Sequence, residues 1–200
     1  MKILGLTGGI ATGKSAVSRM LQKLGANIID TDIIAHNLAE IGEPLYTAYV
    51  EHFGEGVKLE NGELNRAEIA KRIYENEEER KWINSVAHPL IQAKVEEEIS
   101  RLKDLGETNA VIEVPLLFEI GWQKFADVVW VVYVSKETQC ERLQMRDHID
   151  EAAALAKINA QMPIDEKKEL ADVVINNEYH YYKVKNEVKK AWRKFLKPTE

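Results

Sequence analysis

Residues 6–17 read LTGGIATGKSAV, and this stretch decides the fold. The residues that fill the phosphate-binding loop pattern G-x-x-x-x-G-K-[ST] are Gly8, Gly13, Lys14 and Ser15. Such a loop joins a buried strand to a helix. Residues 2–6 form a short apolar run that suits a strand, and residues 15–24 carry apolar side chains at helical spacing. The pattern therefore stands in the strand, loop and helix order that a nucleotide-binding fold requires.

The backbone of this loop is expected to bind phosphate through inward-facing N–H groups. Glycine is favoured where the chain approaches the anion, at Gly8, Gly9 and Gly13. The following helix adds unpaired N–H groups and the positive end of its dipole. Lys14 is expected to reach the β- and γ-phosphates, and the Ser15 hydroxyl to hold Mg²⁺. The alternative is a plain glycine-rich turn with a solvated lysine, but the complete pattern favours a nucleoside triphosphate site.

The composition limits the classes of protein to which this chain can belong. The chain has 200 residues and 45% hydrophobic content, enough for one domain with an insertion or two. A net charge of −6 disfavours a general nucleic-acid binder. Cys140 is the only cysteine, which excludes an internal disulfide and fits a reducing compartment. The longest apolar run, residues 128–134, is far below the ~20 residues of a membrane span. We therefore expect a cytoplasmic protein without nucleic-acid or membrane partners, as a monomer or weak homo-oligomer.

A second short strand, residues 26–29, leads into the acidic sequence Asp30-Thr31-Asp32. In an open α/β sheet, ligands bind at the carboxyl ends of the strands, so both carboxylates are expected near the phosphate loop. Asp32 and His36 are four residues apart and share one face of the next helix. Helix N-capping is the alternative role for either aspartate, and one of the two is expected to be the cap.

The region from 44 to 106 has a helical pattern and is expected to be an insertion that covers a substrate. Arg66 opens one of its helices. A longer helix, at about 77–105, is expected to break or bend at His88-Pro89 because proline removes a backbone donor. By default His88 is a packing or capping residue.

The third strand, residues 110–114, contains Glu113 near its carboxyl end. A carboxylate there needs a cation or a water network, so Glu113 is a candidate for ordering the water of Mg²⁺, with an ion pair to Lys or Arg as the alternative. After a fourth, apolar strand, Arg142 and Arg146 stand four apart on one helix face. They suit a lid that closes on a transferring phosphate, and surface arginines are the alternative.

The C-terminal part completes the α/β pattern. Residues 150–162 predict a helix, and residues 171–177 predict a fifth strand and turn whose exposed amides suit contact with a base. The tail, residues 179–196, has apolar side chains on one side and lysines on the other, which indicates a helix packed on the sheet. A basic surface for membrane or nucleic acid is the alternative for this helix.

The chain resembles the dephospho-coenzyme A kinase family nearly end to end. The segments that carry the resemblance are residues 6–15, the sequence DTDIIAH at 30–36, His88-Pro89, PLLFE at 115–119, Arg142 with Arg146, Gln161, and residues 172–176. The loop is common to many families, whereas DTDIIA and PLLFE are far more particular. Asn-Lys-x-Asp and Asp-x-x-Gly sequences are missing, which argues against a GTPase.

This resemblance implies an α/β fold of the three-layer P-loop nucleoside triphosphate hydrolase type, with a five-stranded parallel sheet. The implied organisation is one kinase unit (1–200) with a core of 1–32, 108–135 and 170–200, a helical coenzyme A-binding insertion of 33–107, and a lid of 136–169. The implied reaction transfers the γ-phosphate of ATP to the 3′-hydroxyl of dephospho-coenzyme A, giving coenzyme A and ADP in the final step of coenzyme A biosynthesis.

The resemblance also implies residue roles. Asp32 takes the general-base position, and Lys14, Arg142 and Arg146 assist transfer. The implied ATP-binding residues are Gly8, Gly9, Ala11, Thr12, Gly13, Lys14, Ser15, Ala16 and Asn176. The implied substrate-binding residues are Asp32, Ile33, His36, Arg66, His88 and Phe118. Mg²⁺ is expected on Ser15, with Glu113 acting through water.

Four positions depart from the family pattern. Ala11 replaces a frequent glycine, Glu113 a frequent aspartate, and Gln92 and Lys157 frequent arginines. An alanine at position 11 is tolerable if its φ is negative. Two rival functions stay open from the residues alone, a kinase for another nucleoside or nucleotide and an ATP-binding switch or adaptor.

Overall fold

The computed structural model describes residues 1–197, except for the side chains of residues 74 and 75. The chain divides into two compact units. Unit 1 comprises Met1–Ile29 and Leu102–Glu200, and unit 2 comprises Asp30–Arg101. Each unit has its own apolar core.

Unit 1 is built around a five-stranded parallel sheet of strand order β2-β3-β1-β4-β5. The strands are β1 (Lys2–Gly8), β2 (Ile28–Asp30), β3 (Asn109–Glu113), β4 (Val128–Tyr133) and β5 (Val173–Asn176). β1 is the central strand and runs directly into the glycine-rich loop. The predicted α/β class and five-stranded parallel sheet are confirmed.

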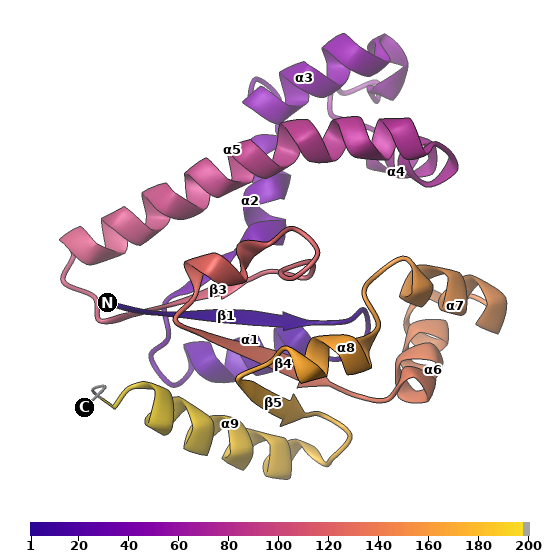
Figure 1. The fold of residues 1–200 in the computed structure, drawn as a ribbon. Helices are drawn as coiled ribbons and strands as arrows, with labels where there is room; N and C mark the ends of the chain where they lie inside the picture. Colours follow the sequence, from indigo (N-terminus) through magenta and orange to yellow (C-terminus); the bar gives the residue numbers. More distant parts are fainter. Residues whose placement is uncertain (198–200) are drawn as a thin grey trace. The chain divides into compact units, whose positions relative to one another are not determined.

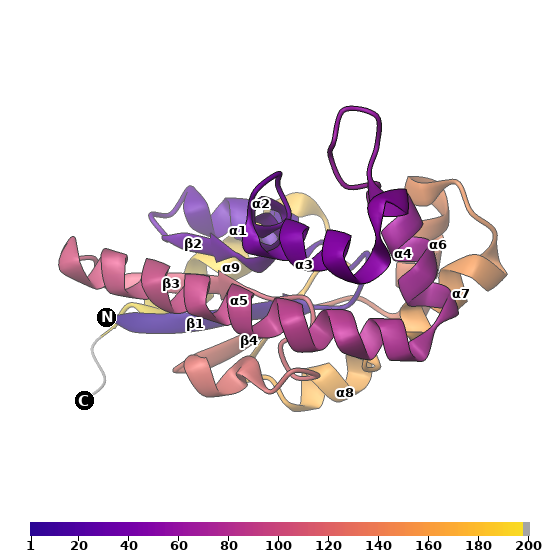
Figure 2. The same cartoon turned by 90° about the horizontal axis from the view of Figure 1, so that it is seen from above.

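Helices cover both faces of this sheet (Figures 1 and 2). Helices α1 (Lys14–Gln22) and α9 (Tyr181–Phe195) lie on one face, and α8 (Ile164–Glu169) and the short 3₁₀ helix η2 (Trp122–Phe125) lie on the other. Side chains alternate along a strand, so Leu4 and Leu6 both point into the core under α1 and α9. The tail is therefore the predicted sheet-packed helix, with its apolar face buried.

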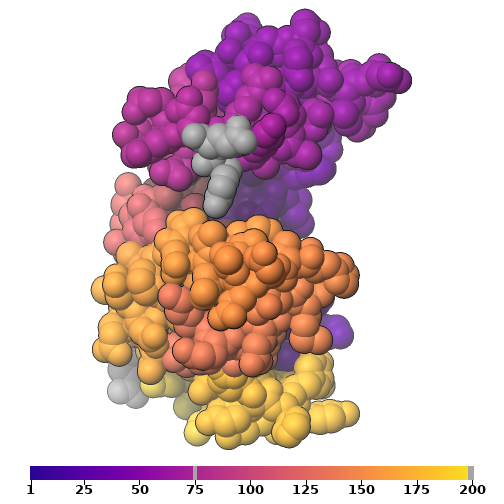
Figure 3. Space-filling view, turned by 90° about the vertical axis from the view of Figure 1, so that its right-hand side faces the viewer, coloured from indigo at the N-terminus to yellow at the C-terminus, as the bar shows by residue number. Residues whose placement is uncertain are grey.

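A helical pair follows β4. Helices α6 (Lys136–Asp147) and α7 (Glu151–Asn159) enclose a small apolar cluster and account for most of the orange surface in Figure 3. Ser135 caps α6 and Asp150 caps α7, each through a side-chain oxygen that accepts a backbone N–H bond. α7 ends earlier than the predicted helix of residues 150–162, because the chain turns there and then starts α8 after Pro163.

Unit 2 is helical. It contains α2 (Thr31–Leu38), α3 (Pro44–Phe53), the 3₁₀ helix η1 (Glu55–Val57), α4 (Arg66–Glu75) and most of α5 (Glu77–Asp104). The long helix was predicted to break or bend at His88-Pro89. A break does not occur, because α5 continues through Pro89, and the bend stays a prediction. Ala87 before the proline and Leu90 after it pack on the same apolar cluster, which compensates for one lost backbone bond. None of the helices within residues 1–197 has the length and apolarity to cross a bilayer.

Candidate active site

The phosphate loop lies between β1 and α1, and its glycines are required by close contacts. Gly13 is the N-cap of α1, has a φ of 86°, and makes no side-chain cap bond, so no side chain of the cap occupies the N–H groups of the first turn. A Cβ at Gly13 would also collide with the amide nitrogen of Asn177. A Cβ at Gly8 would stand 2.8 Å from the carbonyl oxygen of Val132. A larger side chain at Gly8 would press on backbone, whereas at Gly13 the left-handed φ disfavours other residues and the Asn177 side chain would have to move.

Lys14 forms a buried ion pair with Glu113. The Lys14 Nζ lies 2.5 Å from Glu113 Oε1, and the side chains are 11% and 3% exposed. β1 and β3 are paired neighbours, and Leu6 is in register with Glu113, which places the carboxylate beside the loop that follows β1. The ion pair considered for Glu113 from sequence is thus present in the structure.

The two arginines of α6 lie in different surroundings. Arg142 is half-buried and donates to the carbonyl oxygen of Asn177 at 2.9 Å, and Asn177 in turn donates to the loop carbonyl of Thr12 at 2.8 Å. Arg146 instead donates to Asp147 at 2.7 Å on the surface. The structure therefore brings Arg142 to the phosphate loop through Asn177, while Arg146 forms part of a surface charge cluster.

Lys157, one of the departures from the family pattern, belongs to the same surface cluster. Lys157 contacts Asp147 at 2.8 Å, so Asp147 is shared between Arg146 and Lys157. Hydrogen bonds from Arg146 and then Lys157 hold the pKa of Asp147 far below its usual range. Asn176, one of the predicted ATP-binding residues, accepts a bond from the backbone N–H of Glu178. Its neighbour Asn177 reaches the loop, and sequence pattern alone did not separate the two asparagines.

The start of α2 resolves which aspartate is the helix cap. Asp30 Oδ1 accepts the backbone N–H groups of Asp32 at 2.9 Å and Ile33 at 3.3 Å. Asp32 lies in the first turn, where the helix dipole favours a negative charge. The cap role predicted for one of the two residues belongs to Asp30.

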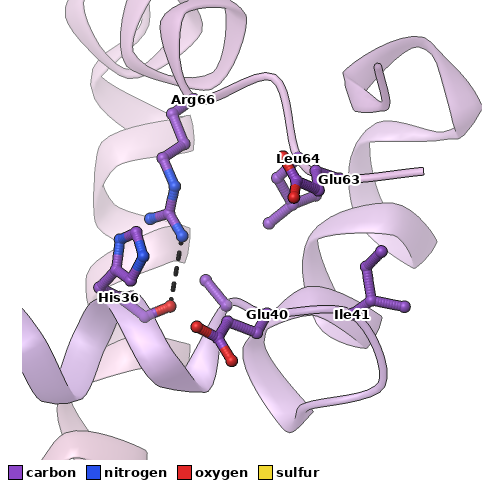
Figure 4. A pocket seen from close by; sticks show the side chains of 7 residues that line it. His36, Glu40, Ile41, Glu63, Leu64 and Arg66 are labelled. Carbon is purple, nitrogen blue, oxygen red and sulfur yellow. Dashed lines mark hydrogen bonds between the residues drawn. The ribbon is translucent and has the colours of Figure 1, made fainter. Parts of the chain in front are cut away.

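Two predicted substrate residues line one pocket of unit 2 (Figure 4). Its volume is about 360 Å³, and its lining residues are His36, Ala39, Glu40, Ile41, Glu63, Leu64 and Arg66. Arg66 donates to the carbonyl oxygen of His36 at 3.2 Å, which holds the guanidinium beside the imidazole. Ile33, one turn earlier, is 58% exposed. The pocket is thus lined by residues from the end of α2 and from the start of α4.

Comparisons with known proteins identify the family. The family model described as dephospho-CoA kinase matches residues 2–182. The chain belongs to the dephospho-CoA kinase family. A relative from Carboxydothermus hydrogenoformans named dephospho-CoA kinase is 44% identical over 177 residues, covering 88% of this chain and 86% of the relative. Family membership makes the chain an ATP-dependent kinase, and it confirms the resemblance drawn from the motifs.

Solved structures give the same result. A protein from Thermus thermophilus superimposes with a TM-score of 0.85 at 28% identity, covering 98% of each chain. A dephospho-CoA kinase from Campylobacter jejuni superimposes with a TM-score of 0.72 at 28% identity, covering 97% of each chain. The predicted nucleotide-kinase-like fold is therefore that of this family.

The kinase also contains a buried lysine that the sequence did not reveal. Lys167 of α8 is 0% exposed and donates to the carbonyl oxygen of Pro115 at 2.9 Å and to Glu119 at 2.7 Å. Burial lowers the pKa of Lys167, and Glu119 opposes that effect. These bonds hold the PLLFE segment that carries the half-buried Phe118. In the run Asp-Glu-Lys-Lys-Glu nothing distinguishes Lys167 from its exposed neighbour Lys168.

Ala11 does not meet the condition set for it. Its φ is 61°, in the left-handed region, so the alanine of this kinase loop is strained rather than tolerated at a negative φ. The strain of a non-glycine residue there is of order 1–2 kcal/mol. Sequence spacing could not show this, because φ is set by the path of the whole loop.

Ala11→Gly is expected to stabilise the kinase. Relief of strain exceeds the added chain entropy of glycine, so we expect a gain of up to about 1 kcal/mol in the free energy of unfolding. Ala156→Gly inside α7 is the matched control and should cost about 1 kcal/mol. Urea unfolding of both variants measures the difference. A loss at position 11 as large as that at 156 would show that Ala11 carries no strain.

His88 gives a pH dependence of stability. It is half-buried in α5, and burial lowers its pKa below the ordinary value of 6.5. As pH falls through 6.5, the unfolded chain takes up a proton before the folded one does, so stability decreases. The melting temperature of the wild type should therefore fall more between pH 8 and pH 5 than that of His88→Gln. Equal decreases in both proteins would contradict this assignment.

Proposed function

We propose that the chain performs the reaction of its family with Mg·ATP as phosphate donor, using the phosphate loop and Lys14 to hold the triphosphate and Asp32 as general base. The observation that supports the donor site most directly is the complete loop with Lys14 buried against Glu113 at 2.5 Å. The acceptor is the 3′-hydroxyl of dephospho-coenzyme A, and the products are coenzyme A and ADP.

Phosphoryl transfer needs little covalent help from a protein. The donor must be held in line with the attacking hydroxyl while charge on the γ-phosphoryl group is neutralised. In this chain the positive charge comes from Lys14, from the N–H groups that follow Gly13, and from Arg142 of the proposed lid (residues 136–169). Closure of that lid would exclude water, which otherwise competes with the acceptor.

The residues at the loop suit a magnesium ion. Ser15 is exposed in the first turn of α1, and its hydroxyl, together with the Glu113 carboxylate, offers the oxygen ligands that Mg²⁺ prefers. Ser15 would hold the ion directly and Glu113 through a water molecule. Bound there, the ion would neutralise charge on the β- and γ-phosphates.

Asp32 and the residues of unit 2 would handle the acceptor. Asp32 orients the hydroxyl and removes its proton late in the transfer. The pocket of His36 and Arg66, with the exposed Ile33, offers a cation and an apolar surface to parts of the acceptor. His88, Phe118 and the helical insertion of residues 33–107 complete the proposed acceptor-binding part.

An acceptor panel tests this function. Purified protein with Mg·ATP should release ADP with dephospho-coenzyme A and should give only slow release with nucleosides, nucleotides or no acceptor. Release that is independent of any acceptor would indicate an ATP-binding switch. Preference for a nucleoside or nucleotide would indicate the other kinase class.

The two arginines should differ in effect. Because Arg142 contacts the carbonyl of Asn177 and Arg146 is held by Asp147, Arg142→Ala is expected to lower kcat/KM by about 10²-fold, the scale of one lost transition-state donor, and Arg146→Ala by at least tenfold less. Steady-state kinetics at saturating acceptor measures both. Equal losses would indicate that Arg146 leaves Asp147 during turnover and serves the phosphates as well.

A further inference from the structure

The tip of the phosphate loop is enclosed by segment 136–169. The side chains of Ile10 and Ala11 pack on the apolar cluster between α6 and α7. Both backbone groups of Ile10 are bound by glutamines of the same segment. Gln139 Nε2 donates to the Ile10 carbonyl oxygen at 2.7 Å, and the Ile10 N–H donates to Gln161 Oε1 at 2.8 Å. The peptide units on either side of Ile10 are therefore fixed by two side chains that are 22 residues apart in the chain.

Gln139 is placed there at a cost. It is 2% exposed, and among the residues that the structure describes none donates to its Oε1. A buried amide oxygen without a partner is destabilising, so stability alone does not explain this side chain. A Cβ on Gly9 would collide with the Gln139 amide, so the second glycine of the loop makes room for this contact. The absence of a side chain at Gly9 and the position of Gln139 therefore depend on each other.

The two hydrogen bonds to Ile10 lie next to the strained residue Ala11. Ala11 follows Ile10 directly and has a φ of 61°, a conformation that an alanine leaves when nothing holds it. Relaxation of Ala11 would rotate the neighbouring peptides and turn their N–H groups away from a bound phosphate. Fixing the Ile10 N–H and carbonyl groups opposes that rotation.

We propose that Gln139 and Gln161 are positioning residues that hold Ile10 and the left-handed Ala11 in the phosphate-binding shape, and so make nucleotide affinity depend on segment 136–169. Neither side chain needs to touch ATP. The inference rests on the proposed nucleotide site but not on the identity of the acceptor. ADP binding, which uses no acceptor, therefore tests it separately from the kinase reaction.

The test compares variants that remove or keep each bond. Gln139→Met and Gln161→Met keep the side-chain volume but lose the hydrogen bond, whereas Gln161→Glu keeps an acceptor for the Ile10 N–H. Gln144→Met is the matched control, because Gln144 lies on the same helix and donates to Cys140 Sγ instead of the loop. ADP affinity is measured by calorimetry, and KM for ATP and kcat by steady-state kinetics.

We expect both methionine variants at 139 and 161 to weaken ADP binding and raise KM for ATP by about tenfold, within the scale of one lost hydrogen bond. The kcat at saturating ATP and the KM of the acceptor should change little. Gln161→Glu and Gln144→Met should stay near wild type. ADP affinity unchanged by both methionine variants, or lowered equally by Gln161→Glu and Gln161→Met, would overturn the proposal. If Gln139→Met does not fold, the pair of variants at 161 decides.

A double variant tests the connection to Ala11. In the Ala11→Gly background the left-handed conformation costs no strain, so the loss of ADP affinity caused by Gln161→Met should shrink from about tenfold to about threefold. The same loss in both backgrounds would show that the glutamines do not act through the conformation of residue 11.

Discussion

Lys14→Ala is expected to abolish turnover. The lysine carries the positive charge placed nearest to the transferring phosphoryl group, and loss of one such donor costs about 10²–10³-fold in rate where the site is dry. The same change removes the cation that contacts the Glu113 carboxylate, which is 3% exposed. We therefore expect lower stability as well, by up to about 3 kcal/mol, because a buried charge loses its counter-ion. Initial rates of ADP release and urea unfolding measure the two effects.

A second substitution separates these effects. Lys14→Met combined with Glu113→Gln removes both charges of the pair and should recover much of the lost stability while turnover stays absent. If turnover returned with stability, Lys14 would be a structural residue. Substantial activity in Lys14→Ala itself would refute the nucleotide site as drawn.

Asp32→Asn is expected to keep ATP binding and lose at least ~2 kcal/mol of transition-state stabilisation, about thirtyfold in kcat, the low end for a positioned base. An amide still hydrogen-bonds the hydroxyl but cannot take its proton. The helix should survive, because its cap is Asp30 rather than Asp32. Single-turnover rates with dephospho-coenzyme A, together with ADP affinity, measure the effect.

Asp30→Asn is the matched control, since asparagine caps helices as well as aspartate does. It should leave both kcat and the melting temperature near wild type. Turnover of Asp32→Asn within a few fold of wild type would remove Asp32 from the mechanism, and a loss confined to Asp30→Asn would move the base to that residue.

The candidate site was predicted unevenly from the sequence, and the pattern has a physical cause. Gly8, Gly13 and Lys14 could be predicted as phosphate-loop residues because such a loop needs those residue types at fixed spacing. Gln139, Asn177 and Lys167 were not found, because each acts by meeting a backbone group 52 to 165 residues away along the chain: Gln139 contacts Ile10, Asn177 contacts Thr12 and Lys167 contacts Pro115. A glutamine, asparagine or lysine gives no signal of such a partner.

Which of two similar residues takes a role also depends on the tertiary structure. Arg142 and Arg146 share one helix face by spacing, yet only Arg142 reaches Asn177, since Asp147 and Lys157 hold the end of α6 in a surface cluster. The expected break at Pro89 failed for the same reason. Packing of Ala87 and Leu90 on one cluster outweighs a single lost backbone bond.

By itself the sequence determined the family, the α/β class, the nucleotide loop and the residue types available for catalysis, because local spacing and apolar periodicity are properties of neighbouring residues. Only the tertiary structure decided which aspartate caps α2, which arginine meets the loop, the buried partner of Lys14 and the left-handed Ala11. Those features depend on the free energy of contacts between segments that are distant in the chain, and the spacing of residues along the sequence carries no information about that energy.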